Sequence, residues 1–536
     1  MTRNTERDSP LLQALAERFT RFDGHGAIAR WLVERAPRAA VLLILQYLAY
    51  SYFYFILIFT NHTLPNVLLY PYPSFKSRGE GRWIADLIIQ MQGGSGVQSF
   101  QMLAATFVQA INGLLWAEFL GIEGKVASTM VAALLCVYPA FLDYYSFAID
   151  HFTFVIGDTL AILGALSILR GTRIHHFGRA AVFYFLCIGC YQPKIALVGL
   201  GAVLALVLRW EKCAVASPTS DPWCREVLRD LLKMLVAVGG ALVSYALIAK
   251  LMMHGVDVAS QRIHTNSLSE FGAELALVYP KFYRYFARGE IGLPSALRVL
   301  PALAVIAGTA SFVMYIAKRS FGRALAGLGG LLAVPIAIDA AFLANDESWA
   351  SAGRIVSAHG YCFVAFVALG LRSHGLWLRR FAATTAGLAL YYFFVLATQA
   401  SNAAVLKQTY ELAAIGRLVN RMEDRLSLSD ENPRPLIMSG QLPGFDYRRY
   451  IKYFPADCSA HVFTPTLIEY RDVEILNYFF GRVRFRRPTK MERDKALQAM
   501  ADKAQWPASS AVFENEGSAI VILEKPGPRV PLTWTQ

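Results

Sequence analysis

Long apolar runs alternate with short polar connections along the first 400 residues of the chain. Runs of roughly 20 apolar residues can cross the hydrocarbon core of a bilayer as helices. They predict about eleven transmembrane helices, at residues 39–60, 101–120, 126–142, 152–169, 179–192, 194–209, 234–253, 298–317, 324–344, 355–371 and 381–399. We therefore expect a mainly α fold, that of a polytopic membrane protein.

One apolar run, residues 179–209, is too long to be a single span. As one helix it would extend about 46 Å, against a hydrocarbon core of about 30 Å. Arginines and lysines flank this run on both sides, and such residues collect in cytoplasmic connections. We therefore expect two helices that turn near the CYQPK segment at 190–194, with a re-entrant hairpin as the alternative.

The pattern changes after residue 400. Helical periodicity over 402–426 is followed by short apolar stretches, such as PLIMSG and SAIVILEK, between polar segments. This alternation is typical of a small α/β domain outside the membrane. We thus divide the chain into a cytoplasmic segment (1–38), a transmembrane domain (39–399) and an outer α/β domain (400–536). Leu11, Leu12, Leu15 and Phe19 recur at helical spacing, so the first segment is expected to lie as an amphipathic helix on the inner face.

Charge fixes the expected orientation of the chain in the membrane. Only 17% of the residues are charged, and the net charge is +13. The basic residues fall mainly in alternate connections, which places 61–100, 143–151, 254–297, 345–354 and everything after residue 400 outside the cytoplasm. The positive charge is explained by topology, so no nucleic acid partner is expected. Six of the seven cysteines fall in spans or cytoplasmic connections, so we expect neither a disulfide framework nor a zinc site.

Polar and ionisable residues gather in three segments that are expected at the outer face. They are Arg78, Glu80, Arg82 and Asp86 in SRGEGRWIADLI, Asp143 and Asp150 in FLDYYSFAIDHFTF, and Tyr191, Gln192 and Lys194 in YQPK. A carboxylate can deprotonate a hydroxyl nucleophile, and a guanidinium can bind a phosphate through paired hydrogen bonds. This set of residues therefore suits a reaction in which a lipid phosphate leaves at the outer leaflet.

Each of these residues also has a structural interpretation. Glu80 can simply pair with a neighbouring arginine in a solvated loop. Asp143 can cap a helix, and it shares a helical face with Asp150 only if the helix continues between them. Lys194 can extend to the membrane surface. Asp158, inside a predicted span, needs a partner on another helix or a wet cavity.

Three segments in order resemble a known family. GRWIADLI, then PAFLDYYSFAID, then CYQPK are similar to the GRP-ADL, P-FLE--SY-FD and LYQ-S segments of the Gtr type II family of phage-type, serotype-converting O-antigen glucosyltransferases. The resemblance covers roughly residues 40–210. The matching positions are Gly81, Arg82, Ala85 and Asp86 in the first segment, Asp150 in the second, and Tyr191 and Gln192 in the third.

The resemblance implies a GT-C-like membrane glycosyltransferase of the bacterial inner membrane with a periplasmic C-terminal domain. Such enzymes move a hexose, typically glucose, from a polyprenyl-phosphate carrier to a lipid-linked polysaccharide such as the O-antigen of lipopolysaccharide. Members place a pair of acids soon after the first span, whereas this chain has no acid there before Glu80. Either Glu80 or Asp150 is then the general base, or this chain is a divergent or inactive relative. In an active enzyme, Arg82, with Arg78 or Lys194, is expected to stabilise the departing phosphate. No cofactor is expected; a divalent metal ion beside the acids is compatible with their spacing but not required by it.

Two other classes of protein would also carry such residues. A polysaccharide or lipid transporter, such as a flippase, would line its cavity with acids and arginines, but it would be expected to show internal repeats, which this sequence lacks. A non-catalytic scaffold for envelope assembly would tolerate neutral substitutions at Glu80 and Asp150. The expected partners of an enzyme are the lipid-linked sugar donor, the lipid-linked acceptor and membrane lipids.

Overall fold

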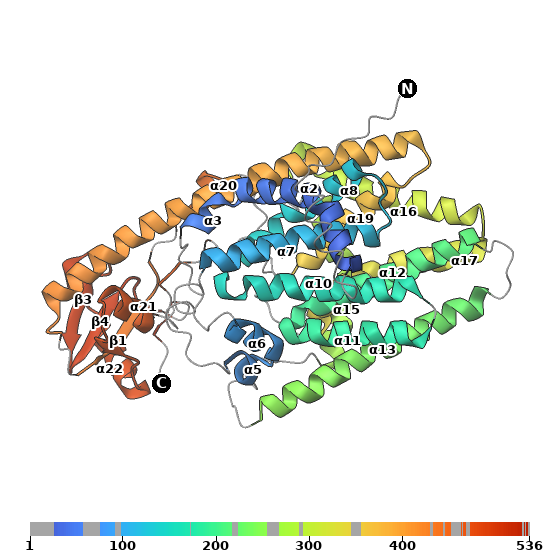
Figure 1. Cartoon of the computed structure of the whole chain (residues 1–536). Coiled ribbons are helices and arrows are strands. Elements are labelled where there is room, and N and C mark those ends of the chain that lie inside the picture. Colours follow the sequence, from blue (N-terminus) through green and yellow to red (C-terminus); the bar gives the residue numbers. More distant parts are fainter. Residues whose placement is uncertain are drawn as a thin grey trace.

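A computed structural model of the chain describes residues 26–56, 75–91, 98–171, 173–216, 223–254, 267–288, 293–344, 355–428, 432–442, 445–451, 463, 465–467, 472–527, 530 and 532–533. A long helical bundle fills most of this structure, and a small sheet domain lies beyond one end of it (Figure 1). The amphipathic helix expected around Leu11 to Phe19 and the connection 345–354 lie outside the described residues.

The helices of the bundle follow the apolar runs of the sequence. They are α2 (Gly26–Ala49), α7 (Gln98–Phe119), α8 (Lys125–Cys136) with η1 (Pro139–Phe141) and α9 (Leu142–Tyr145), α10 (Ala148–Arg170), α11 (Ile174–Cys190), α12 (Ile195–Ala216), α13 (Trp223–Met252), α16 (Val299–Ala317), α17 (Phe321–Ile338), α19 (Ser357–Leu371) and α20 (Leu376–Arg425). The elements that connect them are α3 (Ser51–Phe55), α5 (Phe75–Glu80), α6 (Trp83–Met91), η2 (Gln192–Lys194), α15 (Leu268–Ala287), η3 (Ser295–Leu297) and α18 (Ala340–Ala344).

Seven helices in the described part of the chain are long and apolar enough to cross a membrane: α7, α10, α12, α13, α16, α17 and α20. An eighth candidate is the α8–α9 pair, which bends by 47°. By length and composition, the described helices therefore give seven or eight candidate spans and not the expected eleven. Two of the missing three, α11 and α19, are apolar but short, and the third is α2. Helix α19 is buried from Ser357 to Gly370, so neighbouring helices rather than lipid surround it.

The predicted turn within residues 179–209 is present. Helix α11 ends at Cys190, the η2 turn spans Gln192–Lys194, and α12 begins at Ile195. Both helices pack on α10. Since proline at the second position of η2 has no N–H to satisfy, it suits the start of the new helix.

Close helix packing holds the centre of the bundle together. A Cβ on Gly164 of α10 would lie only 2.3 Å from the Tyr184 ring of α11, so only glycine permits this approach. On the other side of α10, the Asn112 amide of α7 donates to the Val155 carbonyl at 2.8 Å and accepts from the Thr159 hydroxyl at 2.7 Å. Small residues and interhelical hydrogen bonds are the usual means of association in a membrane, where lipid competes for apolar contacts.

The two ends of the bundle differ in chemistry. Ion pairs at the end away from the sheet domain join Arg35 to Glu118, Arg209 to Asp230, Arg323 to Glu226 and Arg372 to Glu211. These residues lie in or next to connections that the charge pattern predicts to be cytoplasmic. Helices α5 and α6 lie at the other end, nearer the sheet domain (Figure 1).

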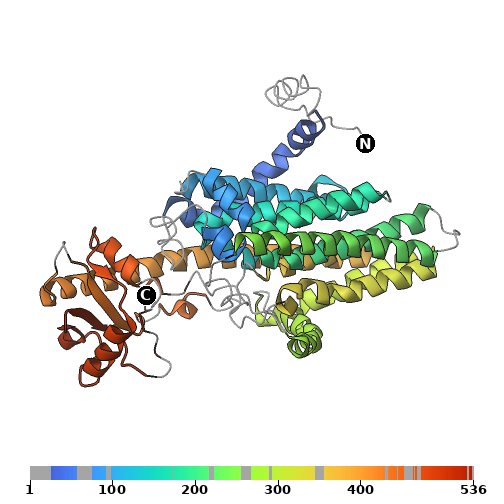
Figure 2. The same ribbon diagram turned by 90° about the horizontal axis from the view of Figure 1, so that it is seen from below.

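Helix α20 links the bundle to the C-terminal domain. It runs for 50 residues without interruption, so the expected domain boundary at residue 400 falls inside a continuous helix. The domain is a four-stranded sheet in the order β2-β1-β4-β3, made of β1 (Arg434–Ser439), β2 (Phe485–Arg486), β3 (Val512–Asn515) and β4 (Ser518–Ile522). Strand β1 pairs in parallel with β2 and β4, while β3 and β4 are antiparallel. With α21 (Asp472–Phe479) and α22 (Lys490–Met500), this is the small α/β domain predicted from the sequence (Figure 2).

Candidate active site

The site begins with a sharp corner between two short helices. Helix α5 ends at Glu80 and α6 begins at Trp83, with Gly81 between them at a φ of +68° that glycine adopts readily. The carboxylate of Asp86 accepts the backbone N–H of Lys76 at 3.1 Å and of Ser77 at 2.6 Å. The first N–H groups of a helix have no partner within it, so Asp86 supplies what the start of α5 lacks. Asp86, one of the residues that the sequence offers for substrate binding, thus holds the start of α5 on α6.

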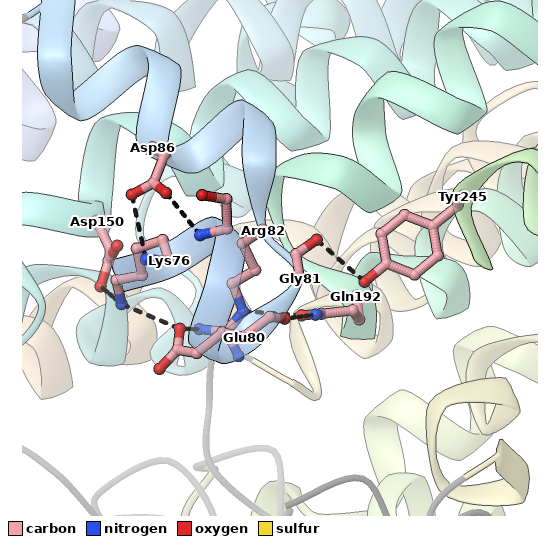
Figure 3. Close-up of polar contacts among 9 residues, drawn as sticks. Lys76, Glu80, Gly81, Arg82, Asp86, Asp150, Gln192 and Tyr245 are labelled. Carbon is pink, nitrogen blue, oxygen red and sulfur yellow. Dashed lines mark hydrogen bonds and ion pairs between the residues drawn. The ribbon is translucent and has the colours of Figure 1, made fainter. Parts of the chain in front are cut away.

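A chain of ion pairs crosses this corner. The Lys76 ammonium lies 3.0 Å from the Asp150 carboxylate on α10 and 3.3 Å from Glu80 Oε2. Glu80 Oε2 also accepts from Arg82 Nη1 at 2.7 Å. Figure 3 shows the resulting order, Asp150–Lys76–Glu80–Arg82. Two acids and two cations thus balance in charge, and Lys76 lies between the two acids that the sequence offers as alternative bases.

Accessibility separates the two acids. Lys76 and Asp150 are buried, with side chains 7% and 4% exposed. Glu80 and Arg82 are more open, at 16% and 22%. Burial alone would lower the pKa of Lys76, but the Asp150 and Glu80 carboxylates outweigh it and raise that pKa above its ordinary value. Lys76 therefore stays charged, and Glu80 is the more exposed of the two acids.

The third sequence segment meets the first at Arg82. The Arg82 Nε donates to Gln192 Oε1 at 2.7 Å, and its guanidinium carbon lies 4.6 Å from the centroid of the Tyr191 ring. The Gln192 amide donates in turn to the Glu80 carbonyl. From α13, the Tyr245 hydroxyl donates to the Gly81 carbonyl at 3.3 Å (Figure 3). The guanidinium is thereby held at a fixed orientation beside Glu80.

Lys194 lies in a second polar cluster inside the bundle. Its ammonium pairs with the Asp158 carboxylate and donates to the Tyr144 hydroxyl, and both members of the ion pair are buried. Ser357 of α19 lies 3.5 Å from the same ammonium. A buried charge in a membrane protein needs such partners, so Asp158 has the interhelical partner that the sequence required of it. Lys194 is therefore bound to Asp158 rather than to the Glu80–Arg82 pair.

Two further expected residues lie apart from the ion-pair chain. Asp143 is fully buried and accepts from the Ser146 hydroxyl at 3.1 Å. The helix does not continue to Asp150, because α9 ends at Tyr145 and α10 begins at Ala148, with the Ser146 hydroxyl bonded back to the Asp143 carbonyl. The shared helical face of Asp143 and Asp150 is thus absent. Arg78 is exposed and forms no ion pair within the described residues.

Comparison with known families decides what kind of protein this is. The sequence profile of the glucosyl transferase GtrII family matches residues 66–371, more than half of the chain. The chain belongs to the glucosyl transferase GtrII family. It is therefore a glycosyltransferase of a membrane family. No curated protein and no solved structure matches it.

The GtrII match confirms the predicted resemblance and extends it. The sequence segments indicated the family over roughly residues 40–210, whereas the profile continues to the end of α19. It includes every residue of the ion-pair chain and of the Lys194 cluster. The sheet domain and the whole of α20 lie beyond the match.

Sequence analysis missed Lys76, which bridges the two acids of this GtrII chain. A signal was present, because Lys76 and Glu80 are four residues apart and face each other on one helical turn. Tyr245 was also missed, and it lies too far along the chain for any local pattern to indicate it. In the described part of the chain, no group of three or more His, Cys, Asp or Glu side chains could hold a metal ion. The position between Glu80 and Asp150 is taken by the Lys76 ammonium.

Proposed function

We propose that this GtrII glycosyltransferase moves a hexose, glucose by family, from a polyprenyl-phosphate carrier to a lipid-linked polysaccharide such as O-antigen. The observation that carries the proposal is the contact between Glu80 and Arg82 at a partly open corner. An acid that can take a proton lies beside a guanidinium that can bind a phosphate. Both groups belong to a segment of the chain that carries the family resemblance.

The reaction is a single displacement at the anomeric carbon of the donor. The acceptor hydroxyl oxygen forms a bond to that carbon, and the bond from the carbon to the phosphate oxygen breaks. The hydroxyl proton passes to the Glu80 carboxylate, and the electron pair leaves with the polyprenyl phosphate. Arg82 stabilises the charge on that phosphate, because its guanidinium is already oriented by Gln192 and Tyr191.

Donor binding prepares Glu80 for this role. The Glu80 carboxylate pairs with both Lys76 and Arg82, and two cationic partners stabilise its charged form. A donor phosphate that binds Arg82 would replace Glu80 as its partner. Glu80 would then keep only Lys76, and its affinity for the acceptor proton would rise. Asp150 serves in this scheme as the fixed counter-charge of Lys76.

We propose that the end of the bundle carrying Glu80 faces the periplasm of a bacterial inner membrane. A cytoplasmic N-terminus and a periplasmic sheet domain require an odd number of crossings, and the proposed number is eleven, with α2, α11 and α19 added to the eight candidates. The ion pairs of Arg35, Arg209 and Arg323 at the opposite end support this orientation. Labelling of single cysteines placed at Arg78 and at Lys212 with an impermeant reagent tests it, and only the first should react in intact spheroplasts.

Mass spectrometry of the surface polysaccharide tests the activity. Cells lacking the protein would be compared with cells given back the wild type, Glu80→Gln or the exposed control Glu423→Gln. We expect one hexose per repeat to be lost without the protein and restored by the wild type and by Glu423→Gln. Glu80→Gln should leave the repeat unmodified. An unchanged repeat in every strain would contradict transfer to this polysaccharide, and restoration by Glu80→Gln would contradict the assigned base.

A further inference from the structure

A cavity of about 950 Å³ opens at the end of the bundle away from Glu80. It lies among the turn after α7, the last turns of α12, α16 and α19, and the first turn of α20. The start of α20 and the last turn of α16 lie at the far end of the bundle from the sheet domain (Figure 1). The cavity is therefore separate from the site proposed for sugar transfer.

One side of the cavity is a neutral ion pair. The Arg372 guanidinium donates two hydrogen bonds to the Glu211 carboxylate, at 2.7 and 2.8 Å. The Glu211 side chain is only 8% exposed, so this charge is fully engaged by its partner. Neither group is left to attract a ligand strongly, and the net charge of the cavity depends on its other residues.

The remaining charges of the lining are mostly positive. Apart from that ion pair, the described lining contains three basic residues and one acid. The basic residues are Lys318, Arg319 and Arg379, and the acid is Glu123. Arg319 is held by a 2.9 Å hydrogen bond to the Tyr315 carbonyl and lies 3.9 Å from the Tyr315 ring centroid. Lys318 and Arg379 form no ion pair or side-chain hydrogen bond within the part of the chain that the structure describes. Three cations from two helix ends thus converge with little to neutralise them.

Exposed apolar side chains occur in the two helix ends that line this basic cavity. Met314 of α16 lines it and is 52% exposed, and Leu376 and Trp377, in the same first turn of α20 as the lining residues Leu378 and Arg379, are 47% and 80% exposed. Tryptophan at a helix end is typical of the boundary between lipid and water. A soluble anion would use the cations alone, whereas a lipid would use both the cations and the apolar rim.

We propose that this cavity binds the phosphate-bearing head group of an anionic phospholipid. Its phosphate would accept hydrogen bonds from Lys318, Arg319 and Arg379, and its acyl chains would lie against the exposed residues of α16 and α20. Clustered lysine and arginine at a membrane surface attract anionic lipids in this manner, and arginine adds paired hydrogen bonds to phosphate. The site would anchor the α16–α20 end of the bundle in the leaflet opposite to the reaction.

Native mass spectrometry of the purified full-length protein, titrated with phosphatidylglycerol or phosphatidylcholine, tests the proposal. The variant is Lys318→Gln/Arg319→Gln/Arg379→Gln. The matched control is Arg173→Gln/Lys212→Gln/Arg225→Gln, which removes three exposed basic residues from the same end of the bundle but outside the cavity. We expect the cavity variant to bind phosphatidylglycerol about tenfold or more weakly than the wild type, and the control to bind it normally. Phosphatidylcholine should not distinguish the three proteins.

Three results would overturn the proposal. Equal losses in the two triple variants would mean that general surface charge, and not this cavity, attracts the lipid. Equal binding by the wild type and the cavity variant would mean that the cavity does not bind it. Displacement of phosphatidylglycerol by glycerol 3-phosphate at a similar concentration would indicate a site for a soluble anion. The single variants Lys318→Gln and Arg379→Gln, each expected to give a smaller loss, serve if the triple variant fails to elute as a single folded species.

Discussion

The Lys76 ammonium lies 3.0 Å from the Asp150 carboxylate, and this contact joins α5 to the first turn of α10. Both side chains are buried, so neither charge has water as an alternative partner. The pair therefore holds α5, the helix that carries Glu80, against the helical bundle. Removal of either partner should therefore lower both the stability and the activity of the protein.

Replacement of Lys76 should destabilise the protein through the acids it leaves behind. Lys76→Met removes the partner of a buried carboxylate, and breaking a buried ion pair in this way costs about 3–5 kcal/mol. The double variant Lys76→Met/Asp150→Asn removes both charges and should recover most of that loss. Thermal unfolding in one detergent would measure both.

The surface pair Lys495–Glu516 offers a matched control for this experiment. Its side chains are 52% and 62% exposed, so Lys495→Met should change the unfolding temperature little. If the double variant were no more stable than Lys76→Met, the contact between Lys76 and Asp150 would not be the main role of the lysine.

Arg82→Lys should impair transfer although it preserves the charge. A lysine cannot donate to Gln192 and Glu80 together in the fixed geometry of the guanidinium, and it would lose most of the contact with the Tyr191 ring. We expect kcat to fall about 10- to 100-fold, by analogy with the loss of one preorganised donor at a developing negative charge. An in vitro assay with a polyprenyl-phosphate hexose separates kcat from KM.

Arg425→Lys, on the exposed face at the end of α20, is the control for Arg82→Lys and should leave both constants unchanged. A variant Arg82→Lys with normal kcat and only a raised KM would show that Arg82 binds donor and transition state equally. Its proposed role in stabilising the departing phosphate would then be wrong.

Asp86→Asn should act on stability rather than directly on chemistry. The asparagine oxygen can accept one of the two backbone N–H groups of α5, but its amide nitrogen would face the other donor. The loss of one hydrogen bond to a buried donor costs about 1–3 kcal/mol. Hydrogen exchange of the α5 amides should rise, while transfer per folded molecule should fall only moderately. Native stability with no activity would instead place Asp86 in the reaction.

Asp472 should make the stability of the sheet domain depend on pH. Burial raises the pKa of this carboxyl from 3.8 to about 8, although the Thr533 hydroxyl and the Val473 N–H donate to it. The folded domain then binds the proton more tightly than the unfolded chain does. Its contribution to stability is complete below about pH 4 and is lost as the pH rises toward 8.

Thermal unfolding of the wild type and of Asp472→Asn across pH 4 to 9 checks this sign. Only the difference between the two proteins matters, since other groups titrate in both. The wild type should lose stability relative to Asp472→Asn as the pH rises. A difference that stays constant across this range, or that changes in the opposite direction, would contradict the raised pKa.

The positions of the helices and the family were determined by the sequence itself. Hydrophobicity is a local property, so each apolar run predicts a helix wherever the rest of the chain lies. The turn at Tyr191–Lys194 and the small sheet domain followed from similarly local signals. The charge pattern also predicted that the segments of Arg82 and Gln192 lie at the same end of the bundle, but it did not predict the hydrogen bond between them.

Only the tertiary structure decided which charge meets which. Lys76 finds Asp150 at a separation of 74 residues, Asp86 turns back onto the start of α5, and Lys194 finds Asp158 inside the bundle. Each pairing depends on how far packing removes the side chain from water, because a charge that loses its hydration is costly unless an opposite charge lies within reach. A sequence states which residues can carry charge, but desolvation and distance, which select the partners, exist only once the helices have packed.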